Sequence, residues 1–399
     1  KIADQDGRTV LTATVNAAKL IERLKEAGVR PIVAIPVSLS ADQVSVVLTG
    51  DAVKALAEKG AVLDIRTPNG SYRLPAAEVP IERLLAQFGA GTLPENVAVQ
   101  ADIVRSDGAN VERLRKAAQD GGFSLVASPI DFEVTASSGG RTIRVTSFNS
   151  FVEREIPIPQ GTEAGTVTTA VVLHEDGTIR SVPTKLEVRN GAAYAVINSL
   201  TNSTYSLVSN SVAFKDVEQH WAKGAVNGMG SRMVVGGVGD NQFGPNRDIT
   251  RAEFATMIVR ALGLPQSADA NVFKDVKESD WYGGTVQTAY AYRLINGFED
   301  GTFRPNDKIT REQAMAMIAN AMKITGLSER AQDSSAEERI RSYGDAEEIS
   351  AWAIGGVAQT IEAGIVTGTN DGLLAPKELI RRAEVAVMIE RLLRKSGLI

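Results

Sequence analysis

The stretch DITRAEF at residues 248–254 occurs in three related versions along this sequence. It returns as KITREQA at residues 308–314 and as LIRRAEV at residues 379–385. The first two versions contain a capping box, Thr-x-x-Glu or Thr-x-x-Gln, in which the threonine hydroxyl and the side chain three residues on each accept a free backbone N–H group. The stretch therefore predicts the start of a helix at the same place in three equivalent units.

One residue of the stretch is not explained by a helix start. Each version places an arginine at the first helical position: Arg251, Arg311 and Arg382. The N-terminus of a helix already carries a partial positive charge, so a cation there costs about 0.3 kcal/mol or more. In the third version Arg381 replaces the capping threonine, yet Arg382 is retained. An arginine kept at this position needs an anionic partner.

Two kinds of anionic partner fit the arginines. The first is a carboxylate of the protein, and one aspartate recurs in an aromatic-x-Asp sequence at the opening of each unit: Asp216, Asp275 and Asp345. The second is an anionic ligand, which the guanidinium would bind bidentately with help from the free N–H groups of the helix start. The residues alone leave both partners open.

Each unit also contains one tryptophan and one glycine-bearing turn. The tryptophans are the three of the whole chain: Trp221, Trp281 and Trp352. The first glycine of each turn lies fourteen residues before the arginine: Gly237, Gly297 and Gly368. Because this spacing is constant while the linkers differ in length, we interpret the units as an internal repeat. The tryptophans either stack on a sugar ligand beside the arginine or anchor a short helix to the core.

Apolar residues follow each arginine at positions i, i+3, i+4, i+7 and i+8, which form one face of a helix. They are Phe254, Met257, Ile258, Ala261 and Leu262 in the first unit, Ala314, Met317, Ile318, Ala321 and Met322 in the second, and Val385, Met388, Ile389, Leu392 and Leu393 in the third. We expect the three helices to bury these faces against each other with pseudo-threefold symmetry. The methionines are then core residues and not a cofactor site.

These motifs together resemble a known family. FKDVEQHWAKGAV at residues 214–226, the turn GFEDGTFRPN at residues 297–306 and the three arginine motifs make residues 211–399 similar to three tandem S-layer homology domains. The resemblance implies a three-pronged, pseudo-threefold module with a central helical bundle and with grooves between neighbouring units. It also implies non-covalent attachment to the secondary cell-wall polysaccharide of Gram-positive bacteria, typically through pyruvylated N-acetylmannosamine.

The resemblance also implies roles for the repeated residues. The carboxylate of the pyruvate ketal would be the ligand of Arg251, Arg311 and Arg382. The grooves would be lined by Asp216, Asp275, Asp345, Trp221, Trp281, Trp352, Gly237, Gly297 and Gly368. The second unit departs from the family pattern with REQ in place of RAE, and the third with Leu374 in place of the phenylalanine of the turn.

Residues 1–210 have a different pattern. Helical spacing followed by glycine predicts helices at residues 15–28, 51–60 and 81–89. Alternating or β-branched runs predict strands at residues 31–37, 43–48 and 61–67, and from residue 128 onward the pattern is nearly all β, with a hairpin turn at Glu175-Asp176-Gly177. The carboxylates of Glu153 and Glu155 share one face of a predicted strand, and we interpret that face as solvent-exposed and not catalytic.

We therefore expect a multidomain chain, in which an α+β, β-rich N-terminal region precedes an all-α-dominated triplet with a pseudo-threefold helical bundle. The expected domains are an α+β module at residues 1–128, a β-rich module at residues 129–210, and repeats at residues 211–266, 270–327 and 340–399. The N-terminal region resembles, more weakly, the β-rich spacer that precedes such triplets in some surface proteins.

Composition excludes several function classes. The net charge is −5 with no run of lysine or arginine, which argues against a nucleic-acid or membrane partner. There is no cysteine, and the two histidines, His174 and His220, are too few for a histidine-rich zinc site. We expect no enzyme activity, no cofactor and no metal. The chain begins KIADQ without methionine or signal peptide, so we expect it to be a piece of a longer, secreted protein.

The leading hypothesis is a wall anchor whose N-terminal half is a spacer. Its partner is the secondary cell-wall polysaccharide, and its place is the cell surface. One alternative is that residues 1–210 form a glycosidase or a carbohydrate-binding domain of an anchored enzyme. Another is a lattice protein that self-associates through sheet edges in the N-terminal half.

Overall fold

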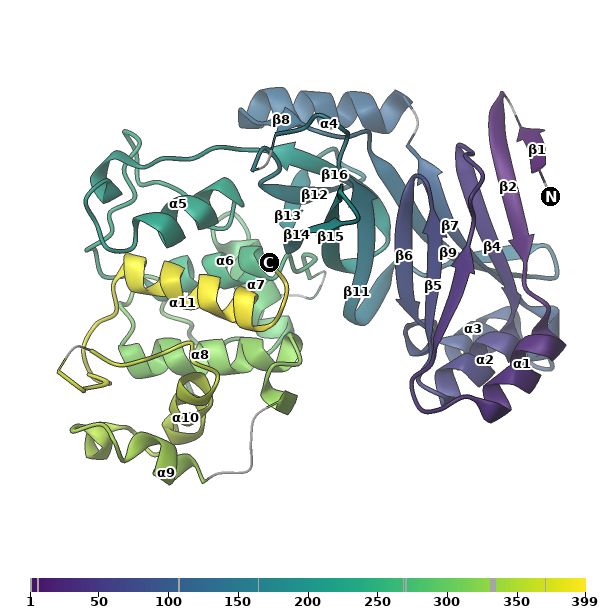
Figure 1. Ribbon diagram of the computed structural model, residues 1–399. Helices are drawn as coiled ribbons and strands as arrows, with labels where there is room; N and C mark the ends of the chain where they lie inside the picture. Colours follow the sequence, from purple (N-terminus) through teal and green to yellow (C-terminus); the bar gives the residue numbers. More distant parts are fainter. Residues whose placement is uncertain are drawn as a thin grey trace. The chain divides into compact units, whose positions relative to one another are not determined.

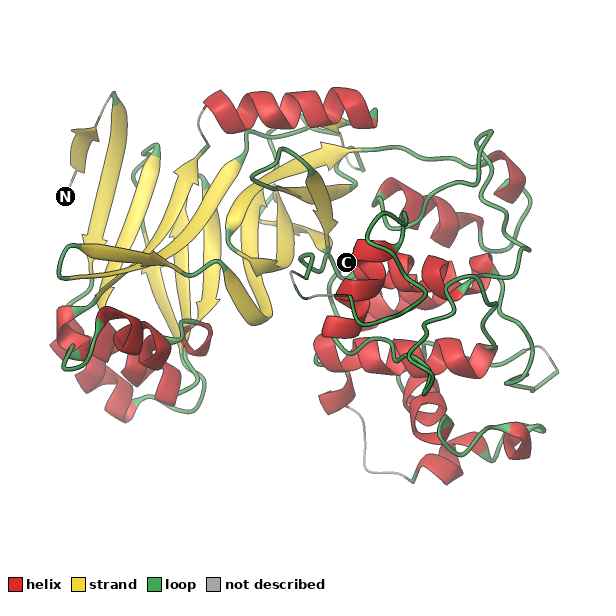
Figure 2. Ribbon diagram, turned by 180° about the vertical axis from the view of Figure 1, so that it is seen from behind, coloured by secondary structure: helices red, strands yellow, loops and turns green. Residues whose placement is uncertain are grey.

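The computed structural model describes residues 2–5, 7–106, 108–163, 165–267, 269, 271–330, 335–369 and 371–399 of the 399-residue chain. The chain divides into two compact units. Unit 1 consists of Lys1–Arg180 and Thr184–Ser209, and unit 2 of Ser181–Pro183 and Asn210–Ile399. Strands dominate unit 1 and helices dominate unit 2 (Figure 1, Figure 2).

Unit 1 is built on two β-sheets. In spatial order the first contains β1 (Ile2–Gln5), β2 (Arg8–Thr14), β4 (Gln43–Thr49), β7 (Ala98–Arg105), β9 (Ile130–Ser138), β16 (Ser203–Ser209), β12 (Thr169–Leu173) and β13 (Ile179–Val182), with β10 (Arg141–Arg144) beside β9 and β8 (Ser124–Leu125) beside β16. The second contains β14 (Thr184–Arg189), β15 (Ala192–Thr201), β11 (Ser147–Pro157), β6 (Gly70–Pro75), β5 (Val62–Thr67) and β3 (Ile32–Pro36). Both sheets take strands from either side of residue 128.

Four helices accompany these sheets. Three were predicted: α1 (Ala17–Glu26), α2 (Gly50–Glu58) and α3 (Ile81–Phe88). They lie together at one end of the sheets, whereas α4 (Gly108–Gly121), which the sequence analysis missed, lies at the other (Figure 1). Helices α1 and α2 occur in the long connections that the parallel pairs β2–β4 and β3–β5 require. Two 3₁₀ turns, η1 (Ala76–Glu78) and η2 (Pro94–Asn96), complete the set in the described residues.

A buried arginine marks the core of unit 1. Arg154 on β11 is fully buried, and its guanidinium carbon lies 5.1 Å from the ring centre of Tyr72 and 4.9 Å from that of Tyr205. The same guanidinium donates hydrogen bonds to backbone carbonyls of β11 and β15. Phe132 of the first sheet packs edge-on against Tyr72 of the second, with ring centres 5.3 Å apart. The two sheets therefore pack face to face around this residue.

The hairpin predicted at Glu175-Asp176-Gly177 is confirmed. It connects β12 to β13, the His174 carbonyl accepts the N–H of Gly177 at 3.0 Å, and Gly177 has a φ of 85°. A positive φ of this kind favours glycine. The solvent-exposed face expected for Glu153 and Glu155 is wrong for Glu155, which is 7% exposed and paired with an arginine of β14.

Unit 2 repeats one helical arrangement three times. Each repeat supplies a short helix and then a long helix that begins at the arginine. The short helices are α5 (Lys223–Ser231), α7 (Gly283–Ala291) and α10 (Ile354–Glu362), and the long ones are α6 (Arg251–Ala261), α8 (Arg311–Ile324) and α11 (Arg382–Lys395). The remaining helical segments in the described part of unit 2 are α9 (Ala336–Ile340), η3 (Lys215–Val217), η4 (Ser328–Arg330) and η5 (Ala346–Glu348).

The three repeats close into a cycle. The short helix of each repeat packs on the long helix of the preceding one: α7 on α6, α10 on α8, and α5 on α11. At the centre, the N–H of Ile249 donates to the carbonyl of Ile380, that of Ile380 to Ile309, and that of Ile309 to Ile249, at 3.1, 3.1 and 3.3 Å. All three isoleucines are at most 1% exposed. Buried backbone groups need such partners, so this ring fixes the repeats to one another.

The apolar stripes behave as predicted. All fifteen stripe residues of α6, α8 and α11 and of the positions just after α6 are buried, the methionines included. The face of each long helix is therefore core. This result confirms the helical period assigned from the sequence.

The description of residues 211–399 as an all-α-dominated triplet was wrong. Isolated antiparallel bridges join Asp248 to Arg381, Thr250 to Lys308, and Thr310 to Leu379, and the described chain as a whole contains two large sheets besides its helices. A capping residue must be extended, as Thr250 is with φ −86° and ψ 161°, and the extended backbone before each helix pairs with its neighbours. The described residues contain no helix long and apolar enough to cross a membrane.

Candidate functional site

The capping boxes place the arginines. The Thr250 hydroxyl accepts the N–H of Glu253 at 3.2 Å, and the Glu253 carboxylate accepts the N–H of Thr250 at 2.9 Å. Thr310 and Gln313 make the same pair of bonds, so both predicted capping boxes are confirmed. In the third repeat only the carboxylate half remains, because an arginine side chain cannot accept a hydrogen bond.

Each arginine reaches from its own repeat into the turn of the next. The Nε of Arg251 donates to the Phe303 carbonyl at 2.8 Å, that of Arg311 to the Leu374 carbonyl at 2.8 Å, and that of Arg382 to the Phe243 carbonyl at 3.0 Å. All three side chains are buried. Burial lowers the pKa of Arg251 and of Arg382. The arginines are therefore part of the contacts between repeats.

The outer nitrogens of the three arginines have different partners. In Arg382, Nη1 donates to the Glu253 carboxylate at 2.9 Å and Nη2 to the Gly236 carbonyl at 3.0 Å. In Arg311, Nη1 pairs with the Glu384 carboxylate. In Arg251, Nη2 donates to the Asn296 carbonyl at 3.0 Å, and among the described residues no carboxylate lies within ion-pair distance of its guanidinium.

The repeated aspartates do not contact the arginines. Each accepts backbone N–H groups of the turn in its own repeat. Asp216 accepts those of Phe243 and Gly244 at 2.8 and 2.7 Å, and Asp275 those of Phe303 and Arg304, both at 2.7 Å. Asp345 does the same with Leu374 and Ala375, at 2.9 and 2.6 Å. The aspartates hold the turn whose carbonyl accepts the arginine.

The repeated glycines have a packing role. A Cβ at Gly297 would lie 2.3 Å from the Phe273 ring and 2.9 Å from the Thr302 carbonyl oxygen. Gly237 and Gly368 are confined in the same way, by the aromatic residue that opens their repeat and by a turn carbonyl. No side chain fits at these positions, so the glycines let the turn close on the aromatic ring.

The tryptophans are exposed, which contradicts core anchoring. Trp221, Trp281 and Trp352 expose 68%, 65% and 60% of their surface. An exposed indole that recurs at one place in three repeats is available to a partner. Trp352 is also one of the residues that line a groove beside Arg251.

The groove beside Arg251 has a volume of about 510 Å³ and takes residues from all three repeats. Its lining is Arg251, Leu294, Ile295, Asn296, Gly297, Phe298, Gln313, Ala316, Met317, Ala319, Asn320, Lys323, Trp352, Gly355, Gly356 and Gln359. Two of these residues are cationic, several are amides, and none is acidic. The arrangement can accept an anion beside an exposed aromatic ring.

Several of these lining residues were missed by the sequence analysis. Gln313, Lys323, Asn320 and Gln359 were not singled out as site residues. Gln313 could have been singled out from the sequence, because the other two repeats have a glutamate, Glu253 or Glu384, at the same motif position. Lys323 carried no such signal, because its place in the groove depends on how α8 and α10 pack.

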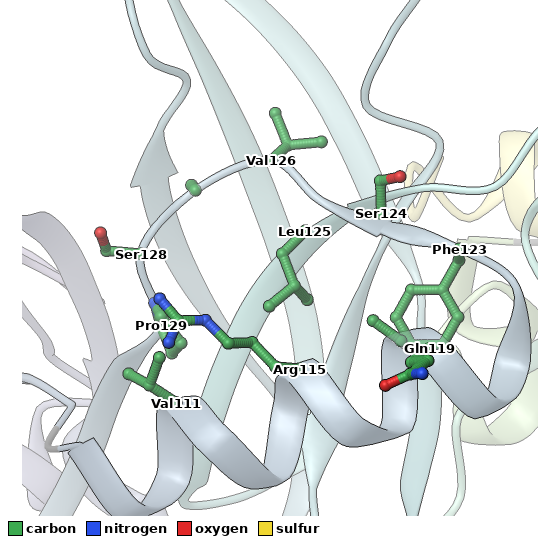
Figure 3. A pocket seen from close by; sticks show the side chains of 11 residues that line it. Val111, Arg115, Gln119, Phe123, Ser124, Leu125, Val126, Ser128 and Pro129 are labelled. Carbon is green, nitrogen blue, oxygen red and sulfur yellow. The ribbon is translucent and has the colours of Figure 1, made fainter.

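Unit 1 contains a pocket of about 560 Å³ between α4 and the segment that follows it. Figure 3 shows Leu125, Phe123 and Val111 among the side chains that line it. Arg115 is the only charged lining residue, and its guanidinium pairs with Glu112. This pocket has few groups that could orient a polar ligand.

A second cleft of unit 1, of about 200 Å³, is polar. Its lining includes Asp131 and Glu133, on one face of β9, and His174. Burial raises the pKa of Glu133, and burial together with Arg180 lowers the pKa of His174. Asp131 accepts hydrogen bonds from the hydroxyls of Ser106 and Thr204 at 2.8 and 2.5 Å.

Comparison with known proteins identifies a repeated domain in unit 2. Three segments match the S-layer homology domain: residues 213–255, 272–315 and 342–386. An exoglucanase of Acetivibrio thermocellus is 37% identical over 201 residues, which are 50% of this chain and 18% of that protein. An amylopullulanase of Thermoanaerobacterium thermosulfurigenes is 37% identical over 203 residues, which are 50% of this chain and 10% of that protein.

A shorter match is to the middle cell wall protein of Brevibacillus brevis, which is 41% identical over 93 residues, 22% of this chain and 9% of that protein. The chain spans less than a fifth of the length of each of these relatives. The predicted location at the cell surface is confirmed by the matched domains. The chain carries three tandem S-layer homology domains, which imply anchoring to the cell wall.

Proposed function

We propose that unit 2 anchors the chain to the wall by binding an acidic polysaccharide in the groove beside Arg251. The observation that carries this proposal is the charge of that groove. It contains Arg251 and Lys323 and no acidic residue, although the chain has a net charge of −5. A cationic groove on an acidic protein selects an anionic ligand.

The ligand chemistry follows from the remaining lining residues. The exposed ring of Trp352 offers a flat apolar face to the CH surface of a sugar, while the amides of Asn320 and Gln359 offer hydrogen bonds to hydroxyl groups. A sugar that carries a carboxylate satisfies all of these groups. The pyruvylated N-acetylmannosamine of a secondary wall polysaccharide is such a sugar.

Arg251 is preorganised for this role. Two carbonyl oxygens hold its Nε and Nη2, and the rings of Phe298 and Phe303 lie 4.9 and 4.7 Å from its guanidinium carbon. A side chain that is already fixed loses little conformational entropy when it binds. The position of the guanidinium at the groove is thus part of the fold.

Cosedimentation with purified wall polymer tests the proposal. We expect the chain to sediment with polymer that carries pyruvate ketals and to remain in solution with polymer from which the ketals were removed by mild acid. Arg251→Ala should reduce the bound fraction. Equal binding to both polymers would contradict a carboxylate ligand.

A second candidate function concerns unit 1. Relatives named exoglucanase and amylopullulanase favour a catalytic or carbohydrate-binding unit on the same chain. The polar cleft contains Glu133, whose pKa burial raises, next to Asp131, and a carboxyl group with a raised pKa near a second carboxylate is the pattern of glycoside hydrolysis. Release of reducing sugar from a glucan, abolished by Glu133→Gln, would establish this function. If unit 1 is only a spacer, no turnover is expected.

A further inference from the structure

The three arginine positions are chemically unequal. Each long helix presents its third residue, which completes the capping box, to the arginine of the preceding repeat. This residue is Glu253 beside Arg382 and Glu384 beside Arg311. Beside Arg251 it is Gln313, which lines the same groove as the arginine. The repeats therefore differ by one carboxylate at otherwise equivalent contacts.

The atoms of these side chains show why the difference matters. One oxygen of Glu253 accepts the N–H of its capping residue, and the other accepts Nη1 of Arg382. Glu384 divides its two oxygens in the same way between Arg381 N–H and Arg311. Gln313 uses its only oxygen for the N–H of Thr310, at 3.1 Å. Its remaining group is an NH₂, which donates and cannot accept.

We propose that Gln313 keeps one of the three arginines open, so that the chain binds a single carboxylate, at Arg251. At the other two contacts a carboxylate of the protein already occupies the place of the ligand. This inference rests on the proposed function and specifies where it acts. A ligand at Arg382 or Arg311 would have to displace a glutamate and leave it without its partner.

A second charge supports the same groove. Lys323 lies twelve residues after Arg311 on α8, and its amine contacts only an amide oxygen, that of Asn320 at 3.2 Å, among the described residues. The equivalent positions in the other repeats are Gly263, which is uncharged, and Arg394, which pairs with Glu390 at 2.9 Å. The groove beside Arg251 thus combines two cations that form no ion pair with a carboxylate in the described part of the chain.

Calorimetric titration of the full chain with pyruvylated N-acetylmannosamine monosaccharide tests the proposal. The wild-type chain should bind one equivalent. Gln313→Glu should weaken binding about tenfold or more, because the new carboxylate pairs with Arg251 as Glu384 does with Arg311. Glu384→Gln should add a second equivalent, because it frees Arg311. Both exchanges conserve shape, and a cooperative melting transition will show that each variant folds. Gln160→Glu, at an exposed position of unit 1, is the control for the added charge.

The outcomes separate the inference from the proposed function. Two or three equivalents in the wild-type chain, or wild-type affinity in Gln313→Glu, would overturn the inference and leave wall binding intact. An unchanged single equivalent in folded Glu384→Gln would contradict the role given to the glutamates. If the wild-type chain binds neither the monosaccharide nor the wall polymer, the proposed function and the inference both fail.

Discussion

The contact that Arg251 makes with the second repeat and the contact that Arg311 makes with the third are built from the same parts. In both, a buried arginine reaches from the start of a long helix and donates to a turn carbonyl at 2.8 Å. They differ at the outer nitrogens. Nη1 of Arg311 pairs with the Glu384 carboxylate, whereas Nη2 of Arg251 donates to the Asn296 carbonyl and Arg251 lines a groove. The same buried arginine thus has a carboxylate partner at one contact and lines a groove without one at the other, which is the basis of the proposed difference in ligand binding.

The largest expected effect is a difference in stability between variants of Arg311 and Arg251. Arg311→Met should destabilise unit 2 by about 3 kcal/mol or more, because it leaves Glu384 without its counter-ion. Arg251→Met should cost less, about 1–2 kcal/mol, since only hydrogen bonds to carbonyls are lost. Chemical denaturation of the full chain measures both. Equal losses would show that Arg251 also has a charged structural partner.

A smaller effect should be common to all contacts. Asp216→Ala and Asp275→Ala each remove a carboxylate that accepts two backbone N–H groups, and each should cost about 2–3 kcal/mol. The melting temperatures of the two variants, compared with that of the wild type, measure this cost. A large difference between the two melting temperatures would show that the turns of the first and second repeats are not equivalent.

Substitution of the tryptophans should change the affinity for the sugar in one groove only and should not change the stability of the chain. Trp352→Ala should weaken binding of the monosaccharide about tenfold, because the stacking face in the groove of Arg251 is removed. Trp281→Ala, which changes an equally exposed ring, should leave both affinity and melting temperature unchanged. Calorimetric titration of each variant measures the affinities. Weaker binding in Trp281→Ala would indicate a second working groove.

The smallest expected effect is a pH dependence of stability in unit 1, which does not involve the arginine contacts. Burial, followed by the charge of Arg180, lowers the pKa of His174 in the folded chain. The neutral form is therefore favoured by folding, so this stability is present above the unfolded pKa of about 6.5 and is lost as the pH falls below it. We expect the melting temperature of His174→Gln to depend less on pH between about 7 and 5 than that of the wild type. An identical slope in both proteins would contradict this assignment.

Parts of the fold followed from local sequence. Thr250 and Thr310 fixed two helix starts to the residue, and the period of the apolar stripes identified the core face of each long helix. Helix α4 was missed although Val111, Leu114 and Ala118 have helical spacing and Gly121 ends the segment. The sheet order was not accessible, since strands far apart in sequence pair with each other.

Part of the candidate site could be predicted from the sequence. The sequence identified Arg251, Arg311 and Arg382 alike as unexplained by helix formation, and of these Arg251 lines the groove described above. Its partners could not be found in the same way, because the cycle joins residues as distant as Arg382 and Phe243. The exposure of the tryptophans likewise depended on packing between repeats. The motif shows that Gln313 stands where the other two repeats have glutamate. The consequence of this difference could not be predicted, because it depends on which arginine Gln313 faces in the folded chain.

The groove beside Arg251 is proposed to be the one that holds the anion. A crystal structure of the chain soaked with pyruvylated N-acetylmannosamine tests it directly. We predict one sugar per chain, with its carboxylate within hydrogen-bond distance of Arg251 and its ring on Trp352. A sugar bound at Arg311 or Arg382, or one at Arg251 whose carboxylate points away from the guanidinium, would contradict the account.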